Sequence, residues 1–324
     1  MPYHQALEAL IASSQEKTLV RAMSGVTARY HEASGAGAHL VTQREEALSY
    51  AAARMDATRA AAQDALSQLK LLMPGFAPRT ALDVGAGTGA ATWAALDVFP
   101  SLEACVCAER ERVMSDVGSA LFAACGLSQV RYTAADAAQP DAAFPAADLV
   151  MSAYMLNELT PSSRESAVRA LWNAASGALV LVEPGTRVGF ENILQARKLL
   201  LDAGAHLLAP CPHARDCPLG AQDWCHFTRR VARTRLQKRL KGGEAPYEDE
   251  HFSYLCVTRE AAAPCCARIL RHPQIRPGHI VLTLCTPEGI QSRTVTKKEK
   301  EAFRAARNAS AGDAWDESVH ASRV

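Results

Sequence analysis

A glycine-rich turn between an apolar segment and a helix-like segment constrains the fold of this chain more than any other feature. The segment Asp83 to Gly89 reads Asp-Val-Gly-Ala-Gly-Thr-Gly. Glycine allows a sharp turn from strand to helix and lets the backbone approach a ligand closely. Such a turn between a strand and a helix predicts a nucleotide-binding loop, although the loop alone does not decide which nucleotide binds.

Short apolar segments alternate with helix-like segments from this loop onward. This alternation predicts a doubly wound α/β fold with parallel strands, whose ligand lies at the carboxyl ends of the strands. The predicted strands are Thr80 to Val84, Leu102 to Cys107, Val130 to Tyr132, Leu149 to Ser152 and Ala178 to Val182, with helices such as Ala90 to Val98 and Ser163 to Ala175 between them. Later elements are predicted as a helix near Phe190 to Ala203 and strands at Phe252 to Val257 and His279 to Leu284.

Acidic residues beside the predicted strands indicate the ligand. Glu109 follows the second strand, where an acid accepts ribose hydroxyls in NAD enzymes and methyl-donor enzymes alike. Asp83 before the glycines and Asp136 after the third strand are typical of class I methyltransferases, and they favour S-adenosylmethionine over NAD. Taken singly, Glu109 and Asp136 are equally consistent with solvated loop acids. The predicted fold is that of a class I S-adenosylmethionine-dependent methyltransferase, and the predicted cofactor-binding residues are Asp83, Gly85, Ala86, Gly87, Gly89, Glu109, Asp136 and Asn157.

The segment Asp148 to Leu159 occupies the fourth-strand position, which faces the methyl group in this fold. It contains neither the Asn/Asp-Pro-Pro-aromatic motif of base-amino methyltransferases nor the Pro-Cys nucleophile of cytosine C5 enzymes. Asn157 and Glu158 suit the orientation of an acceptor, but helix capping and packing explain them as well. The sequence therefore supports cofactor binding more than catalysis, and it assigns no catalytic residue.

Cysteines indicate a second site in the later half of the chain. Of the ten cysteines, three occur as C-x5-C-x7-C at Cys211, Cys217 and Cys225, beside prolines. Disulfides are disfavoured in the cytosol, and three thiolates this close repel one another unless a cation binds them. A metal ion or a cluster is therefore predicted. Cys285 is favoured over Cys256 as the fourth ligand, because it ends a predicted strand.

Zinc and an iron-sulfur cluster both accept four thiolates. Zinc sites tend to pair ligands at C-x2-C to C-x4-C, so the wider spacing and the prolines lean toward iron-sulfur, with a structural or redox-sensing role. The C-x3-C-x2-C pattern of radical S-adenosylmethionine chemistry is absent. Buried free thiols are the alternative, and the favoured one for Cys265 and Cys266. His213 and His226 are further candidate ligands, although exposed loop histidines are commoner.

A basic stretch follows the cysteines and is predicted to form a helix from about His226 to Lys241. The stretch contains no acid, and the first acid after it is Glu244. Repulsion among its positive charges therefore favours a phosphate partner. The net charge of +1 means that any attraction to nucleic acid comes from such local clustering. A second basic stretch, Lys297 to Arg307, is diluted by acids. The predicted RNA-binding residues are Arg229, Arg230, Arg233, Arg235, Lys238, Arg239 and Lys241.

Four units are expected along the chain. They are a helical segment at 1–75, an S-adenosylmethionine-binding core at 76–205, an iron-sulfur and RNA-binding extension at 206–308, and a flexible tail at 309–324. The amino terminus shows no signal peptide or transit peptide, and no apolar run reaches the roughly 18 residues of a membrane span. We expect a cytoplasmic protein that is a monomer when free.

Several segments together resemble the methyltransferase-like assembly proteins of the mitochondrial small ribosomal subunit and their bacterial relatives, described as predicted rRNA methyltransferases. The resemblance covers residues 45–310. Its most specific stretches are Cys211 to Phe227 and Tyr247 to Leu255. The other matching stretches are Tyr50 to Met55, Leu82 to Trp93, Tyr154 to Leu159, Val182 to Thr186 and Gly278 to Cys285.

The resemblance implies a 4Fe-4S cluster on Cys211, Cys217, Cys225 and Cys285. It also implies binding to the rRNA and ribosomal proteins of the small subunit during assembly. Members of this family are expected to act by occupying the subunit more than by transferring a methyl group. The expected function is thus that of an assembly factor. An active rRNA methyltransferase is the alternative, and a zinc-binding methyltransferase of another substrate is a lesser one. Because no import signal is seen, the chain looks like a bacterial member.

Overall fold

The computed structural model describes residues 2–33 and 37–316. Its central sheet has the order β3-β2-β1-β4-β5-β8-β6, in which β1 to β5 are parallel and β8 runs antiparallel between β5 and β6. The dinucleotide fold has six strands in the order 3-2-1-4-5-6, so the inserted antiparallel strand identifies the class I methyltransferase fold. The strands are β1 (Thr80–Val84), β2 (Ala104–Glu109), β3 (Val130–Ala134), β4 (Ala147–Ala153), β5 (Ala175–Pro184), β6 (His206–Ala209) and β8 (Tyr247–Thr258).

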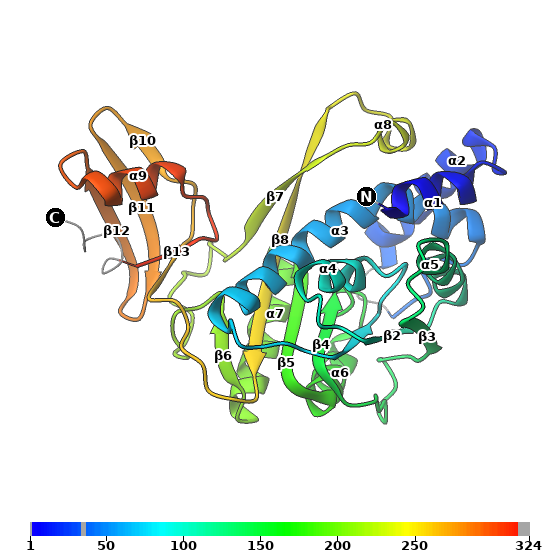
Figure 1. Ribbon diagram of the computed structural model, residues 1–324, viewed down its shortest axis with the longest axis horizontal. Coiled ribbons are helices and arrows are strands. Elements are labelled where there is room, and N and C mark those ends of the chain that lie inside the picture. The colour runs from blue at the N-terminus through cyan, green and yellow to red at the C-terminus, as the bar shows by residue number, and fades with distance from the viewer. Residues whose placement is uncertain (1, 34–36, 317–324) are drawn as a thin grey trace.

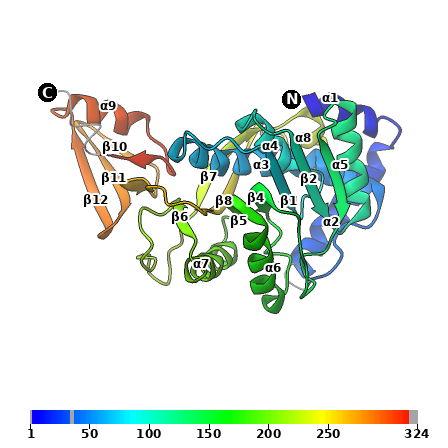
Figure 2. The same ribbon diagram turned by 60° about the horizontal axis from the view of Figure 1, so that its bottom comes forward.

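Helices cover both faces of this sheet (Figure 2). Along β5, Val180 and Val182 pack in the core beneath one helical layer, while Leu179 and Leu181 pack beneath the other. This alternation explains why both faces of a central strand are apolar. The first layer contains α3 (Arg44–Leu72), α4 (Ala90–Val98) and α5 (Arg112–Ala124), and the second contains α6 (Pro161–Ala174) and α7 (Arg187–Asp202). The predicted bounds of β1 and α4 are confirmed.

The amino-terminal helices α1 (Pro2–Ile11) and α2 (Glu16–Ala33) pack near the start of α3 and against the core (Figure 1). Alanine-rich α3 favours a helix by intrinsic propensity, and the Glu46 carboxylate caps its first turn by accepting from the backbone N–H of Gln43 at 3.2 Å. Trp93 of α4 stacks on Phe122 of α5 with ring centroids 4.7 Å apart, and Tyr3 packs against Trp93. The first residues of the chain are thereby joined to the nucleotide-binding half of the sheet.

An arm of two strands and a short helix replaces the predicted basic helix. The prediction of a helix from His226 to Lys241 is wrong in its first half, because β7 (Phe227–Ala232) is a strand paired with the first half of β8. Only α8 (Arg235–Lys241) is helical, and it begins at a Thr234–Gln237 capping box. In Figure 1 the arm crosses α3 and brings α8 toward α2.

A small β domain with its own core ends the described chain. Trp315 is buried in this core, and its strand pairs with β9. The expected flexible tail is therefore wrong for residues 314 and 315, while 317–324 lies outside the described residues. The elements are β9 (Ala267–Ile269), β10 (Gln274–Arg276), β11 (His279–Thr286), β12 (Gly289–Thr296), α9 (Lys300–Asn308) and β13 (Ala314–Trp315). In the described part of the chain, no helix has the length and apolar character needed to cross a membrane.

Candidate functional site

A cavity lies at the carboxyl ends of β1, β2 and β4, where the glycine loop leaves β1. Gly85 adopts φ +70°, a left-handed conformation that favours glycine, and a Cβ there would lie 2.6 Å from Cγ of Met155. Its N–H donates to the carbonyl of Ala108 on β2 at 2.9 Å. Gly85 and Gly87 of the loop therefore line the cavity with backbone atoms, because they carry no side chains.

Asp83 is the most deeply buried acid of this cavity, with 1% of its surface exposed. Its Oδ2 accepts from the backbone N–H and the hydroxyl of Thr92, at 3.1 and 2.8 Å. Its Oδ1 is buried and has no hydrogen-bond partner among residues 2–33 and 37–316. Burial raises the pKa of the Asp83 carboxyl to about 7. An unpaired carboxylate oxygen in a buried cavity wall is suited to a cationic donor such as an amino group.

Glu109 and Asp136 line the same cavity. Glu109 is buried, which excludes the solvated-loop interpretation for this residue. Its two carboxylate oxygens accept from the N–H groups of Gly87 and Glu111, at 2.7 and 2.8 Å. Asp136 accepts from the N–H of Ala138 at 2.9 Å. Both acids are therefore fixed by backbone donors, and burial raises the pKa of Glu109.

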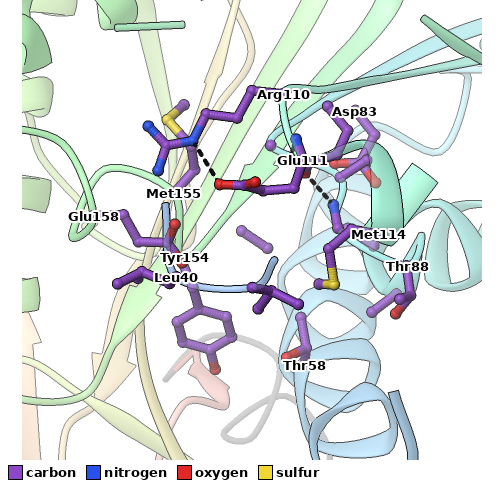
Figure 3. Close-up of a pocket in the computed structure, with 18 of the residues that line it drawn as sticks. Leu40, Thr58, Asp83, Thr88, Arg110, Glu111, Met114, Tyr154, Met155 and Glu158 are labelled. Atoms are coloured by element: carbon purple, nitrogen blue, oxygen red, sulfur yellow. Dashed lines mark hydrogen bonds and ion pairs between the residues drawn. The ribbon is translucent and has the colours of Figure 1, made fainter. Parts of the chain in front are cut away.

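The cavity brings together most of the predicted cofactor-binding residues. Asp83, Gly85, Ala86, Gly87, Glu109 and Asp136 are in its wall, whereas Gly89 and Asn157 are not among the described residues that line it. Gly89 instead caps α4, where a Cβ would lie 2.5 Å from Phe122. In Figure 3, Asp83, Thr88 and Met114 lie on one side, and Tyr154, Met155 and Glu158 on the other.

The amino-terminal segment supplies a wall that the sequence does not reveal. Leu40 and Val41 line the cavity. The N–H of Gly37 donates to the carbonyl of Glu158 at 3.0 Å, and Arg110 donates to the carbonyls of Gly37 and Ala38. Residues 37–41 therefore form a strap between the ends of β2 and β4. Tyr30, Tyr50, Met55 and Thr58 also reach the cavity, although no local motif marks them.

Aromatic and acidic side chains occupy the end of β4. Tyr154 has φ +63°, a strained conformation for a residue with a side chain, and its hydroxyl donates to Glu250 at 2.7 Å. The Tyr30 hydroxyl donates to Glu158 at 2.9 Å, and its ring stacks on Tyr50. Burial raises the pKa of Glu158 to about 7. In this fold the methyl acceptor lies at the end of β4. In this chain, side chains that are hydrogen-bonded to one another occupy that position.

The four predicted cysteine ligands line a second cavity. Cys211, Cys217 and Cys225 lie on the loop after β6, and Cys285 lies on β11 of the small β domain. Burial, followed by the neighbouring Cys211 and Cys217, raises the pKa of Cys285 to about 12. The remaining wall is largely apolar, from α7 and β8. The structure therefore brings the four predicted cysteines into the wall of one cavity.

The other candidate ligands lie in different positions. Cys256 is in the main core, and its thiol donates to the carbonyl of Ala65 at 3.5 Å. Cys265 is buried, and Cys266 is exposed. His213 lies in the cavity wall, with Nε2 3.9 Å from the sulfur of Cys285. Within residues 2–33 and 37–316, no three His, Cys, Asp or Glu side chains are arranged as ligands of a metal ion.

The predicted basic surface carries acids that the basic stretch itself lacks. Register pairs Arg230 on β7 with Asp249 on β8, and their ion pair has distances of 2.7 and 2.8 Å. Arg233 and Lys241 both contact Glu248, at 3.1 and 2.5 Å. Arg229 pairs with Asp64 and Arg239 with Glu16, at 3.4 and 3.6 Å. The expectation of unrelieved self-repulsion is therefore wrong.

Comparison with known proteins gives one family and several relatives. The model of the family described as mitochondrial small ribosomal subunit Rsm22 matches residues 44–316. The human mitochondrial ribosome assembly protein METTL17 is 31% identical over 288 residues, which cover 82% of this chain and 61% of the human protein. The ribosome assembly protein RSM22 of Saccharomyces cerevisiae mitochondria is 22% identical over 245 residues, which cover 44% of this chain and 39% of the yeast protein. The chain thus spans less than two thirds of the length of these relatives.

Solved structures similar to this chain include two methyltransferases. An O-methyltransferase family protein from Burkholderia thailandensis has a TM-score of 0.46 and 13% identity, over 77% of this chain and 73% of that one. Magnesium protoporphyrin IX methyltransferase from Synechocystis, with bound S-adenosylmethionine, has a TM-score of 0.43 and 14% identity, over 77% of this chain and 99% of that one. The named sequence relatives are mitochondrial, and a bacterial cytoplasmic location for this chain stays a prediction.

Proposed function

Because this chain belongs to the Rsm22 family of mitochondrial small ribosomal subunit proteins, we propose that it is an assembly factor of the small ribosomal subunit. It binds S-adenosylmethionine in the glycine-loop cavity, a 4Fe-4S cluster on four cysteines, and small-subunit rRNA through its basic surface. The family match over residues 44–316 is the observation that carries the proposal. The matched relatives are longer than this chain. The activity of the whole relatives is therefore a proposal for this chain.

Binding of S-adenosylmethionine is supported by the donors and acceptors of the first cavity. The unpaired Oδ1 of Asp83 would accept from the cofactor amino group, and Glu109 would accept from the ribose hydroxyls. Asp136, in the wall of the same cavity, would accept from the adenine amino group. When bound, the cofactor supplies a methyl group on a sulfonium. Tyr30, Tyr154 and Glu158 occupy the acceptor side of the cavity, which favours a binding role over methyl transfer.

Affinity for S-adenosylmethionine is expected to fall as the pH is lowered through 7. The pKa of Asp83 is about 7 in the free protein, and only its ionised form attracts an ammonium group. Because the ionised fraction falls about tenfold for each pH unit below the pKa, affinity at pH 5.5 should be roughly 25-fold weaker than at pH 7.5. Isothermal titration calorimetry measures this ratio. Asp83→Asn should bind weakly at both values, and an affinity of the unaltered chain that does not change with pH contradicts the assignment.

The presence of four thiols from two parts of the fold in the wall of one cavity supports the 4Fe-4S cluster. Cys211, Cys217 and Cys225 come from one loop, and Cys285 comes from the small β domain. The largely apolar wall of the cavity would limit the access of water to such a centre, which is one of the factors that set its reduction potential. The wide spacing of the three loop cysteines also favours a cluster over zinc. The centre would join the small domain to the methyltransferase core.

Binding to rRNA is assigned chiefly to α8, where two basic residues remain without acid partners. Among the described residues, Arg235 and Lys238 form no ion pair, whereas Arg230, Arg233 and Lys241 are paired with acids of β8. Arg235 is exposed and Lys238 is half-buried. Phosphates would compete poorly for the paired side chains. The proposed rRNA-binding surface is therefore limited to α8, at the tip of the arm.

Replacing Arg235 and Lys238 together by glutamine is expected to weaken binding to a small-subunit rRNA transcript. Each lost phosphate contact lowers the slope of log affinity against log salt by about one, so the slope should fall by about two. Filter binding between 50 and 200 mM salt, values chosen to span that dependence, measures it. Arg112→Gln with Arg169→Gln, exposed residues of α5 and α6, is the control with the same change in charge. Equal slopes for the two double variants contradict the assignment to α8.

A further inference from the structure

Two buried arginines lie in the wall of the four-cysteine cavity. Arg197 belongs to α7 of the core and Arg268 to β9 of the small domain. Their exposed fractions are 6% and 1%. Fully buried arginine is rare unless its charge is paired. Within the described chain, neither guanidinium forms an ion pair with a carboxylate, and the cavity wall contains no Asp or Glu. No carboxylate of the cavity wall therefore balances their charge.

Backbone carbonyls fix both guanidinium groups beside the cysteines. Arg197 donates from Nη2 to the carbonyls of His213 and Arg215, at 2.9 and 2.6 Å, and so holds the loop between Cys211 and Cys217. Arg268 donates from Nε to the carbonyl of Pro210 at 2.9 Å, beside Cys211, and from Nη1 to Oε1 of Gln68 and the carbonyl of Gly312, at 2.6 and 2.8 Å. Both guanidinium groups are therefore bonded to the loop that carries the thiols, and that of Arg268 also to α3 and to the small domain.

Each arginine keeps one buried N–H group that has no acceptor among the described residues. These groups are Nε of Arg197 and Nη2 of Arg268, and two further polar atoms of the same wall, Oη of Tyr254 and Nδ1 of His213, also have no hydrogen-bond partner in that part of the chain. Four unpaired polar atoms around one cavity are costly, because a buried group without a partner loses its hydration and gains nothing. Such a set is explained by acceptors that fill the cavity when it is loaded.

We propose that Arg197 and Arg268 are positioning residues for the thiolate-bound centre, which neutralise its charge and donate hydrogen bonds to its sulfur atoms. Four thiolates on a doubly positive cluster core carry a net charge of minus two, which two guanidinium groups balance. The Tyr254 hydroxyl is a third donor to the same centre. The proposal deepens the proposed function and rests on it, since it requires a centre on Cys211, Cys217, Cys225 and Cys285.

Charge compensation has two measurable consequences. Removal of a neighbouring positive charge weakens retention of a dianionic centre, and outer contacts of this kind are typically worth about ten- to hundredfold in metal affinity. Removal also disfavours uptake of a further electron, so the reduction potential falls. Arg268 comes from the small domain and Arg197 from the core. The centre and its two cations therefore join both parts of the protein.

The test uses the full chain, loaded with iron and sulfide without oxygen, as Arg197→Met, Arg268→Met and the charge-preserving Arg268→Lys. Arg59→Met is the control, since Arg59 is also buried with an unpaired Nε but pairs with Asp97, away from the cysteines. Circular dichroism establishes that each variant is folded. Loss of metal to EDTA and a redox titration followed by absorbance are the two measurements.

We expect both methionine variants to lose metal to EDTA at least about tenfold more readily, and their one-electron equilibrium to shift about tenfold toward the oxidised state, which corresponds to about 59 mV. Arg268→Lys should lie between Arg268→Met and the unaltered chain, and Arg59→Met should match the unaltered chain. If the methionine variants retain metal and potential like Arg59→Met, the proposal is overturned. If the unaltered chain takes up zinc and no iron, the iron-sulfur assignment fails, while EDTA competition still decides the role of the arginines. If it takes up neither, both fail.

Discussion

Replacing Cys225 with serine is expected to remove the iron-sulfur cluster from this chain. Cys211, Cys217 and Cys285 all act electrostatically on Cys225, so it has every other predicted ligand as a neighbour. Its carbonyl accepts from the Ser253 hydroxyl of β8 at 2.8 Å, which fixes its position on the sheet. A hydroxyl does not replace a thiolate as a soft ligand of iron. We expect more than about nine tenths of the bound iron and sulfide to be lost.

Purification without oxygen, followed by analysis of iron and acid-labile sulfide, measures this loss. Cys266→Ser is the matched control, because Cys266 is exposed and lies outside the cavity wall. The control should keep its iron and the broad visible absorbance of iron-thiolate charge transfer. Equal iron in the two variants contradicts the four-cysteine assignment. Zinc in place of iron in the unaltered protein contradicts the cluster itself but leaves the ligand set intact.

Replacing Gly85 with alanine is expected to abolish measurable binding of S-adenosylmethionine. The residue has φ +70°, and its new Cβ would lie 2.6 Å from Cγ and 2.7 Å from Cβ of Met155. The left-handed conformation costs an L-residue roughly 1–2 kcal/mol. Met155 also has to move, and it forms part of the cavity wall. Strain and displacement together should weaken affinity by about a hundredfold or more, which corresponds to about 2.7 kcal/mol.

Gly126→Ala separates these two effects. Gly126 has φ +72°, and a Cβ there meets no atom within 4 Å, so the substitution adds the same backbone strain without a clash. Calorimetric titration of both variants with S-adenosylmethionine gives the comparison. The Gly126 variant should lose stability and keep its affinity. If Gly85→Ala binds as tightly as Gly126→Ala, the glycine loop does not contact the ligand in the way proposed.

The nucleotide half of the fold follows from local sequence signals. The glycine loop needs left-handed backbone between a strand and a helix, and β1 and α4 have the predicted bounds. Asp83 and Glu109 meet in one cavity because the carboxyl ends of neighbouring parallel strands lie at one edge of the sheet. The strap of residues 37–41 has no such signal. Its position depends on docking of α2 and α3, which is tertiary packing between segments distant in sequence.

The basic arm shows why composition alone misleads. Between Phe227 and Ala232 the chain is a strand, and its Arg229 and Arg230 lie opposite Glu250 and Asp249, which are 21 and 19 residues later on β8. A count of charges within the basic stretch cannot include these cross-strand partners. Helical structure begins only at the capping box of Thr234 and Gln237. Within the described chain, Arg235 and Lys238 of α8 form no ion pair, and only the structure identifies them.

One part of the cysteine site can be predicted from local sequence, and another part depends on tertiary structure. Close spacing of Cys211, Cys217 and Cys225 predicts a ligand set from sequence, and the strand end at Cys285 predicts the fourth member; the structure places all four in the wall of one cavity. The buried arginines cannot be identified in the same way. Arg268 is one of several arginines in its region, and only its place in the cavity wall distinguishes it.

Deletion of the gene for this chain in its own organism, with small subunits and rRNA methylation measured from the same cells, tests the central claim most directly. Density gradients quantify mature and immature small subunits, and mass spectrometry of their rRNA detects every methylated nucleotide. An assembly factor that acts by binding predicts fewer mature small subunits with an unchanged set of methylated nucleotides. Loss of one methylated nucleotide from subunits that mature at the normal rate would contradict the account and support the methyltransferase.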